Sequence, residues 1–414
     1  MDNETLAKQL FFAKEAAEYL HITVQRLNKL IQDGKLKPLK KNSSGTIFHI
    51  DELNRRKAEL EIFERIGNGG ACMFKIDTKA KQEALNYATL MNVLGMTELR
   101  LEPKFNKLSE LIPVDAPMDR PEICKAYADF FHIEENKLLH AYKIAYRAFS
   151  ELKETDEIIK RGSSEYPPLL AETKQAPRFL YIRGKKSLLY EKRTVALVGS
   201  RQASENSKNN TKRLAVTLGK NGITVVSGLA KGIDVSAHRA ALENGFNTIA
   251  VIGTNLNQYY PLENKSVQLE IEKKGLVVSQ FPPSSKTQRW FFPMRNGVMS
   301  GLSLATVIME AGETSGALKQ ADFALKQDRQ IIIPQNVLET EKITWPQKYV
   351  QKGAAVVESP TDVLKVLAEN HVFKSNRITL SRQQTLADYL QNMNQPSKRQ
   401  TADDWIEPAI LEGE

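Results

Sequence analysis

Short apolar runs that end in a small residue recur through the middle of the chain. Each run is rich in Val and Ile, is followed by a glycine, a hydroxyl side chain or a cation, and is separated from the next by a segment of helical length. The five segments are 194–201, 223–231, 248–254, 305–312 and 330–336. Such runs are typical of parallel strands that are buried on both faces. The pattern predicts an α/β fold, an extended Rossmann-like parallel sheet flanked by helices.

The residues after these predicted strands are suited to binding an anion. In parallel sheets, ligands bind where the loops leave the carboxyl ends of the strands, and small residues there let backbone N–H groups approach a phosphate. Arg201 is placed for bidentate phosphate contact, although a salt bridge to a neighbouring loop is the alternative. The other candidates at the strand ends, or on a positive track leading outward from them, are Gly199, Ser200, Ser227, Gly228, Lys231, Gly253, Thr254, Lys265 and Arg295. We expect Asp234 to cap the helix that begins near Val235, and His238 to be a packing residue.

Other chemistry is disfavoured by the motifs that the sequence lacks. No G-x-G-x-x-G follows the first predicted strand, and no ribose-binding acid or Walker loop is present. A glycine-rich stretch at 66–71 has no strand before it and is interpreted as a linker. Cys72 and Cys124 lie far apart without a CxxC pairing, which argues against a zinc site or a disulfide framework. We therefore expect no cofactor and no metal.

A different pattern occupies the N-terminus. Residues 13–20 have a helical apolar face, Thr23 can cap a second helix over 24–33, and residues 35–41 and 46–50 read as a two-stranded wing. This plan resembles the excisionase and MerR-type winged helix-turn-helix module. The side chains that we expect to face duplex DNA are Gln25, Arg26, Asn28, Lys29, Lys40 and Lys41. The alternative is a helical hairpin that docks on a protein and keeps its basic face in water.

Length and charge complete the outline. A chain of 414 residues is too long for one ordinary core. We expect a winged helix-turn-helix over 1–58, a helical linker or extension over 59–155, the Rossmann domain over 156–368 and a polar tail over 369–414. The net charge of +9 suits a polyanionic partner. Because no apolar run approaches the ~20 residues of a membrane span, we expect a cytoplasmic protein without membrane contact.

Ordered motifs give the Rossmann segment a family resemblance. They lie at 199–201, 227–234, 237–238, 251–254, 260–261 with Asn264, 292–296, and 310–311 with 315–316, after lead-in segments at 166–170 and 180–184. Together they resemble the DprA/Smf family over about residues 158–366. The resemblance implies a non-enzymatic protein that binds single-stranded DNA in its Rossmann crevice, self-associates, and in transformable bacteria helps to load a recombinase. It also adds Asn296 to the candidate single-strand-binding residues.

The chain departs from the family pattern in places. Leu262 stands where a basic residue is usual, which leaves Lys265 as a substitute, and Gly297 replaces the second arginine of an Arg-Asn-Arg motif. A frequent late glycine is Asp328. The family's usual N-terminal helical module is replaced or displaced by the winged unit. These changes predict weaker or redirected single-strand binding.

Three functions remain open. The leading one is DNA processing or recombination by a protein that binds single strands in the crevice and duplex through its N-terminal unit. The second is regulation, as the antitoxin-like restraining partner of a toxin enzyme in a phage-defence operon. The third is nucleoside monophosphate phosphoribohydrolase activity, which Glu310, Thr314 and Ser315 superficially suggest without the Pro-Gly-Gly-x-Gly-Thr loop of those enzymes. Candidate base-stacking side chains are Tyr259, Tyr260, Trp290, Phe291 and Phe292, with core packing as the alternative for the last two.

Overall fold

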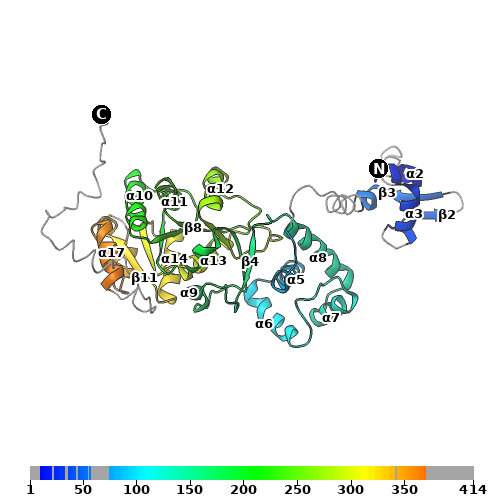
Figure 1. Ribbon diagram of the computed structural model, residues 1–414, viewed down its shortest axis with the longest axis horizontal. Helices are drawn as coiled ribbons and strands as arrows, with labels where there is room; N and C mark the ends of the chain where they lie inside the picture. The colour runs from blue at the N-terminus through cyan, green and yellow to red at the C-terminus, as the bar shows by residue number, and fades with distance from the viewer. Residues whose placement is uncertain are drawn as a thin grey trace. The chain divides into compact units, whose positions relative to one another are not determined.

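The computed structural model describes residues 10–20, 23–32, 36–42, 45–54, 56, 74–340 and 343–369. The chain forms two compact units, Met1–Cys72 and Met73–Glu414 (Figure 1). The glycine-rich stretch, Cys72 and nearly all of the predicted polar tail lie outside the described residues. The finer domain boundaries at 58, 155 and 368 stay predictions.

The first unit packs two helices against a small antiparallel sheet. Its elements are β1 (Leu10–Phe12), α2 (Ala13–Tyr19), α3 (Val24–Gln32), β2 (Lys40–Asn42) and β3 (Gly45–His49). Thr23 caps α3 as expected, because its Oγ1 accepts a hydrogen bond of 3.2 Å from the Arg26 N–H. The hairpin β2–β3 lies in the predicted wing region, but the sequence pattern missed β1, which pairs with β3 so that the sheet order is β1-β3-β2.

The second unit is built on a nine-stranded sheet, with the order β12-β11-β10-β6-β7-β8-β9-β5-β4 among the described residues. The strands from β6 to β12 are parallel, whereas β5 pairs antiparallel with both β9 and β4. Their bounds are β4 Glu157–Lys160, β5 Phe179–Gly184, β6 Thr194–Gly199, β7 Thr224–Ser227, β8 Thr248–Val251, β9 Leu276–Ser279, β10 Ala305–Glu310, β11 Gln330–Pro334 and β12 Ala355–Val357. All five predicted strands are present, which confirms the α/β fold, and four further strands extend it.

Helices cover both faces of this sheet. In Figure 1, α10, α11 and α12 lie above the strands, and α9, α13 and α14 lie below them. Side chains alternate accordingly, since Val195 and Leu197 of β6 pack in the core that contains α10 and α11, whereas Ala196 and Val198 pack in the core that contains α13 and α14. The helix bounds are α9 Pro168–Ala171, α10 Glu205–Lys220, α11 Ile233–Glu243, α12 Lys265–Lys274, α13 Phe291–Gly301, α14 Gly316–Lys326, α15 Gln335–Leu338, α16 Trp345–Val350 and α17 Pro360–Glu369.

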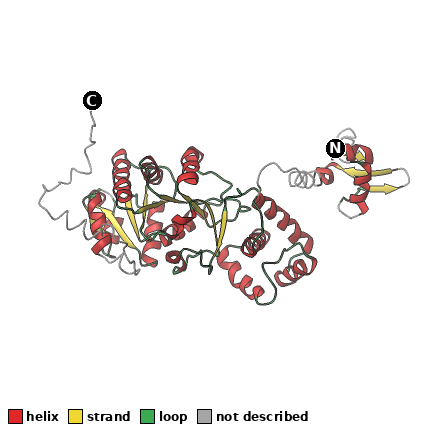
Figure 2. Ribbon diagram, viewed as in Figure 1, coloured by secondary structure: helices red, strands yellow, loops and turns green. Residues whose placement is uncertain are grey.

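Four helices precede the sheet: α5 (Lys79–Leu94), α6 (Glu98–Ser109), α7 (Pro121–Phe131) and α8 (Glu135–Ser150). Figure 2 shows them as helices joined by loops. Their core is continuous with β4, β5, β8 and β9, because Leu85, Leu101 and Phe149 belong to the same buried cluster as Tyr181 and Val277. The helical part of the predicted 59–155 region therefore packs as part of the second unit.

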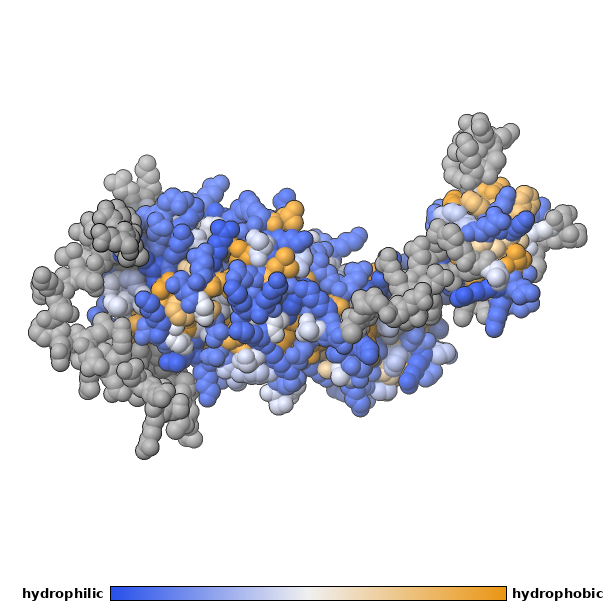
Figure 3. All heavy atoms as spheres, turned by 45° about the horizontal axis from the view of Figure 1, so that its top comes forward, coloured by the Kyte–Doolittle hydropathy of each residue, from blue (hydrophilic) through white to orange (hydrophobic). Residues whose placement is uncertain are grey.

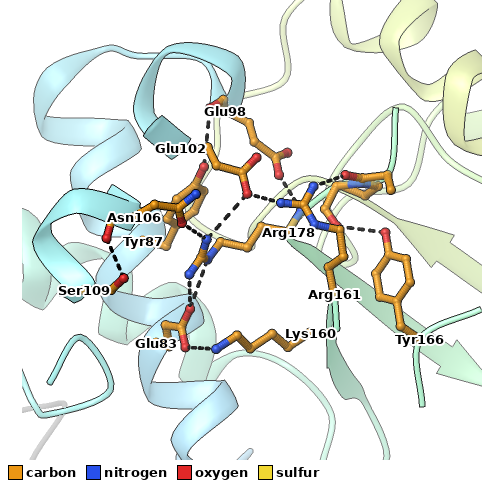
Figure 4. Close-up of polar contacts among 12 residues, drawn as sticks. Glu83, Tyr87, Glu98, Glu102, Asn106, Ser109, Lys160, Arg161, Tyr166 and Arg178 are labelled. Atoms are coloured by element: carbon orange, nitrogen blue, oxygen red, sulfur yellow. Dashed lines mark hydrogen bonds and ion pairs between the residues drawn. The ribbon is translucent and has the colours of Figure 1, made fainter. Parts of the chain in front are cut away.

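A cluster of charged side chains also joins these helices to the sheet edge (Figure 4). Glu83 of α5 binds Lys160 and Arg178, the latter at 2.7 Å, and Glu102 of α6 binds Arg161. The carboxylate of Glu98 accepts a hydrogen bond from the Arg178 backbone N–H. Burial, reinforced by Glu102, raises the pKa of Glu98 to about 7.

Hydrophilic side chains dominate the face of the molecule seen in Figure 3, with apolar side chains scattered among them. Across the described residues, no helix combines the length and apolarity that crossing a membrane requires.

Candidate nucleic-acid crevice

The strand order reverses between β6 and β10. The chain runs from β6 to β7 on one side and from β10 to β11 on the other, so the loops after β6 and β10 diverge. Divergence of this kind opens a crevice at the carboxyl edge of an α/β sheet. The pairing of β10 with β6 shifts in register between Ile308 and Glu310 at this place.

A cavity of about 610 Å³ occupies this crevice. Its lining residues come from the ends of β6, the start of α11, the loop before α13, α13 itself and the start of α14. They are Val198, Gly199, Arg201, Ala230, Asp234, Tyr260, Arg289, Phe292, Pro293, Arg295, Asn296, Met299, Ser315, Gly316, Ala317, Lys319 and Gln320. Its size is that of an ordinary small-ligand pocket.

Three exposed cations form the rim of the cavity: Arg201, Arg289 and Lys319. None of them forms an ion pair with another residue in the described part of the second unit. The guanidinium of Arg201 lies 6.0 Å from the centre of the Phe292 ring, which orients it without neutralising it. The alternative role of Arg201, a salt bridge to a neighbouring loop, is therefore not formed in the structure.

Buried polar groups form the floor: Asp234, Arg295, Asn296 and Gln320. Nη1 of Arg295 donates to the Gly228 carbonyl at 2.6 Å and to the Val251 carbonyl. Burial lowers the pKa of Arg295 to about 10 and raises that of Asp234. The prediction that Arg295 continues the line of cations outward from the strand ends is wrong, because its side chain is only 5% exposed and lies inside the crevice.

Asp234 also differs from its expected role. The helix α11 begins at Ile233, so Asp234 lies in its first turn rather than before it, and Gly232 occupies the cap position. The carboxylate accepts from the Ala230 N–H at 3.4 Å and otherwise faces the cavity. His238, in contrast, packs as predicted: its Nδ1 lies 2.8 Å from Thr248 Oγ1, and burial lowers its pKa to about 3.

Two glycines are required by close packing around the crevice. A Cβ at Gly199 would meet the Ile233 side chain, and one at Gly228 would meet the Arg295 guanidinium. The sequence therefore uses glycine where strand ends, α11 and the buried cation approach one another.

Of the predicted anion-binding residues, the cavity brings together Gly199, Arg201, Arg295 and Asn296. The others contact neighbouring groups instead. Ser227 Oγ donates to the Leu197 carbonyl at 2.6 Å, Thr254 Oγ1 donates to the Gln258 carbonyl at 3.2 Å, and Lys231 pairs with Glu263 at 2.6 Å.

The remaining predicted positions also lie outside the lining. Lys265 Nζ stands 5.0 Å from the centre of the Tyr259 ring, and a Cβ at Gly253 would meet Phe292. The Ser200 N–H donates to the Glu310 carbonyl at 2.7 Å. The carboxylate of Glu310 accepts a hydrogen bond of 2.7 Å from Ser204 Oγ. Glu310 therefore holds the loop after β6 and is not among the residues that line the cavity.

Aromatic side chains form one wall. Tyr260 is 51% exposed and its ring lies 5.1 Å from that of Phe292, which also lines the cavity. Phe291 is instead buried and stacks on the buried Phe281 ring at 3.8 Å, as its alternative packing role predicted. Trp290 is 41% exposed but does not line the cavity.

The loops that carry this wall are braced by the helices α5 and α8. Asn257 Nδ2 donates to the Ala148 carbonyl of α8 at 2.9 Å, and Asn92 Nδ2 of α5 donates to Ser284 Oγ at 2.8 Å. Asn255 Nδ2 ties the two loops together through the Ser285 carbonyl at 2.9 Å. The position of the wall thus depends on the helical part of the unit.

Sequence reasoning missed Arg289, Lys319 and the inward orientation of Asp234. Arg289 lies in an irregular loop whose path no local pattern fixes. Lys319 follows the predicted strand 305–312 by one turn of helix, which was a signal that could have been used. In the described residues, no group of His, Cys, Asp or Glu is arranged to hold a metal ion.

The candidate duplex-contacting residues lie on the first unit. Gln25, Arg26, Asn28 and Lys29 of α3 are exposed, while Leu27 and Leu30 of the same helix are buried. Lys40 is exposed on β2, and the side chain of Lys41 lies outside the described residues.

A doubly wound sheet with a cation-rimmed crevice at its reversal point defines a Rossmann-like binding protein. The family model of DNA recombination-mediator protein A matches residues 157–368, which is half of the chain. The chain therefore belongs to the DNA recombination-mediator protein A family, and the DprA/Smf resemblance is confirmed.

Individual proteins that are similar to this chain carry DprA names, in agreement with the family model. DNA processing protein DprA of Bacillus subtilis (strain 168) is 33% identical over 211 residues, covering 51% of this chain and 71% of that protein. DNA processing protein DprA of Streptococcus pneumoniae (strain ATCC BAA-255 / R6) is 38% identical over 200 residues, covering 48% of this chain and 70% of that protein. The X-ray structure of DNA processing protein A from Streptococcus pneumoniae is similar with a TM-score of 0.53 and 30% identity, covering 70% of this chain and 95% of that one. The structural likeness therefore extends beyond residues 157–368.

Proposed function

We propose that this protein binds single-stranded DNA in the crevice and acts in DNA processing or recombination without breaking a bond. The observation that carries the proposal is the rim of three cations, Arg201, Arg289 and Lys319, none of which has an acidic partner in the described second unit. Unneutralised cations on three different loops and helices suit a polyanion that crosses the opening. Membership of the DNA recombination-mediator protein A family supports DNA as that polyanion.

The shape of the site favours a single strand. A cavity of about 610 Å³ admits one or two nucleotides, whereas a duplex, whose major groove alone is roughly 12 Å wide, is too bulky to enter. The exposed ring of Tyr260 beside Phe292 offers a surface on which an unpaired base can stack.

Duplex contact belongs to the first unit in this proposal. The exposed polar side chains of α3 lie opposite its buried Leu27 and Leu30, which is the arrangement of a recognition helix. The winged helix-turn-helix assignment is part of the proposal. Self-association, and delivery of the strand to a recombinase or a toxin enzyme, remain predictions from the family resemblance.

Fluorescence anisotropy of a labelled, mixed-sequence single-stranded 20-mer tests the proposal. We expect binding at low ionic strength that weakens with salt, with a slope of log K against log salt of about −2 if three phosphates are neutralised. The strand should be recovered intact after incubation. Failure to bind at low salt, or cleavage of the strand or of a free nucleotide, would overturn the proposal.

A further inference from the structure

The cavity is divided into two layers of different charge. Its rim carries only cations among its charged residues, namely Arg201, Arg289 and Lys319, and these are exposed. Its floor carries one acid and one base, Asp234 and Arg295, which are 6% and 5% exposed. A phosphate is suited to the rim, but at the floor it would lie beside a carboxylate. A phosphate backbone therefore does not account for the floor.

The two buried charged side chains of the floor do not neutralise each other in an ion pair. No ion pair joins Asp234 to Arg295, although each influences the pKa of the other. Nη1 of Arg295 donates to two strand-end carbonyls and Nε is enclosed in the protein, whereas Nη2 makes no hydrogen bond among the described residues. The Asp234 carboxylate accepts a long hydrogen bond of 3.4 Å from the Ala230 N–H and is also approached by the Gly228 N–H. Both side chains line the cavity, so the guanidinium can still donate to a ligand there and the carboxylate can still accept from one.

We propose that the floor binds a guanine base of the single strand by its Watson–Crick edge; this inference rests on the proposed function. Guanine presents the carbonyl acceptor O6 beside two N–H donors, at N1 and at the 2-amino group. The two donors match the carboxylate of Asp234, which only accepts, and O6 matches the guanidinium of Arg295, which only donates. Thymine offers a single N–H, and adenine and cytosine offer a single amino group.

The wall and the rim fit the rest of the nucleotide. Tyr260 and Phe292 provide the face on which the purine stacks, as in other sites that read a flipped base. Arg201 lies beside the Phe292 ring at 6.0 Å, where it meets the phosphate that follows the stacked base. Base recognition and phosphate recognition then occupy different layers of one cavity.

The test compares labelled dT12 with dT12 in which one central dT is replaced by dG or by deoxyinosine, which lacks the 2-amino group. We expect wild type to bind the dG strand about five- to tenfold more tightly than dT12, with deoxyinosine between them. Asp234→Asn should lose the preference for the dG strand over dT12, since one of the two acceptor atoms becomes a donor. Thermal denaturation checks that this variant is folded.

Arg201→Ala is the matched control, because it should weaken all three strands by the same factor and keep the preference. Equal affinity of wild type for dT12 and the dG strand overturns the inference while leaving single-strand binding intact. So does an Asp234→Asn variant that binds every strand more tightly, since that result places phosphate at the floor. If no strand binds at low salt, the proposed function fails as well.

Free deoxyguanosine monophosphate distinguishes the source of the base. We expect it to compete with the labelled dG strand only at concentrations far above those of an unlabelled dG strand, because a free nucleotide contacts fewer rim cations. Competition stronger than that of the strand would assign the floor to a free nucleotide and overturn the assignment to DNA.

Discussion

At the scale of single residues, the cations of the rim have the clearest expected effects. Lys319 lies on the first turns of α14 and lines the cavity, whereas Lys326 lies two turns further along the same helix, is also exposed, and does not line it. The two lysines therefore differ mainly in their position relative to the crevice.

We expect Lys319→Ala to weaken single-strand binding by roughly fivefold, or about 1 kcal/mol, and to reduce the salt slope by about 0.7, the loss of one phosphate contact. Lys326→Ala should change neither quantity. Anisotropy titrations over a series of salt concentrations measure both. An unchanged slope for Lys319→Ala would mean that this lysine touches no phosphate.

A second prediction concerns Gly228. The added Cβ of Gly228→Ala meets the guanidinium of Arg295, which is buried and held by strand-end carbonyls, so one of the two must shift. We expect a loss of about 1–3 kcal/mol of stability and weaker single-strand binding. Gly316→Ala is the control, because its Cβ meets nothing within 4 Å. Thermal denaturation compares them, and equal melting temperatures would show that Arg295 is not fixed.

At the scale of elements, the junction between the helices α5–α6 and the strand β5 carries a titratable group. Glu98 has a pKa of about 7 in the folded protein, raised mainly by burial, whereas its ordinary value is 4.5. A carboxyl group with a raised folded pKa favours the folded state when it is protonated. Its contribution to stability is therefore lost as pH rises from about 4.5 to about 7, and stays constant above that range.

We expect Glu98→Gln to remove this loss because glutamine is neutral at every pH. The variant should match wild type near pH 4.5 and exceed it in stability at pH 8. Since Glu98 is only partly buried as a residue, we expect a gain of about 1–2 kcal/mol. Melting temperatures measured across this pH range check the prediction. Parallel curves for the two proteins would contradict it.

Elements were predictable from sequence where the pattern was strong and local. The apolar runs ending at Gly199, Ser227 and Glu310 indicate buried parallel strands, because they are short, rich in β-branched residues and followed by small residues. The strands β1 and β12 have only three residues each, too few for a period to emerge.

The candidate site was predictable only in part. Glycines and Arg201 at strand ends follow from topology, since the loops after parallel strands all leave the sheet at the same edge. The inward positions of Asp234 and Arg295 depend on how α11 and α13 pack, and no spacing in the sequence encodes that. Ser227 and Thr254 follow strands as expected, but their hydroxyl groups satisfy nearby carbonyls and are not available to a ligand in this structure.

At the scale of the whole molecule, the two compact units predict two separable DNA-binding activities. We expect Arg201→Ala to lose single-strand affinity and to retain duplex binding. Arg26→Ala/Lys29→Ala should do the reverse, because these exposed side chains of α3 lie on the other unit. Titration of both variants with labelled single and double strands of one sequence measures the division. Equal loss of both ligands in both variants would contradict it.

The bracing of the crevice wall has a mechanical consequence. Chain that leaves the first unit enters the second through α5, and Asn92 of that helix holds one wall loop at Ser284. Tension exerted on the first unit, as when it is anchored to a duplex while a strand is drawn through the crevice, would therefore be transmitted through α5 to this wall loop as well as to the sheet edge at Lys160. The grip on the strand would then respond to load.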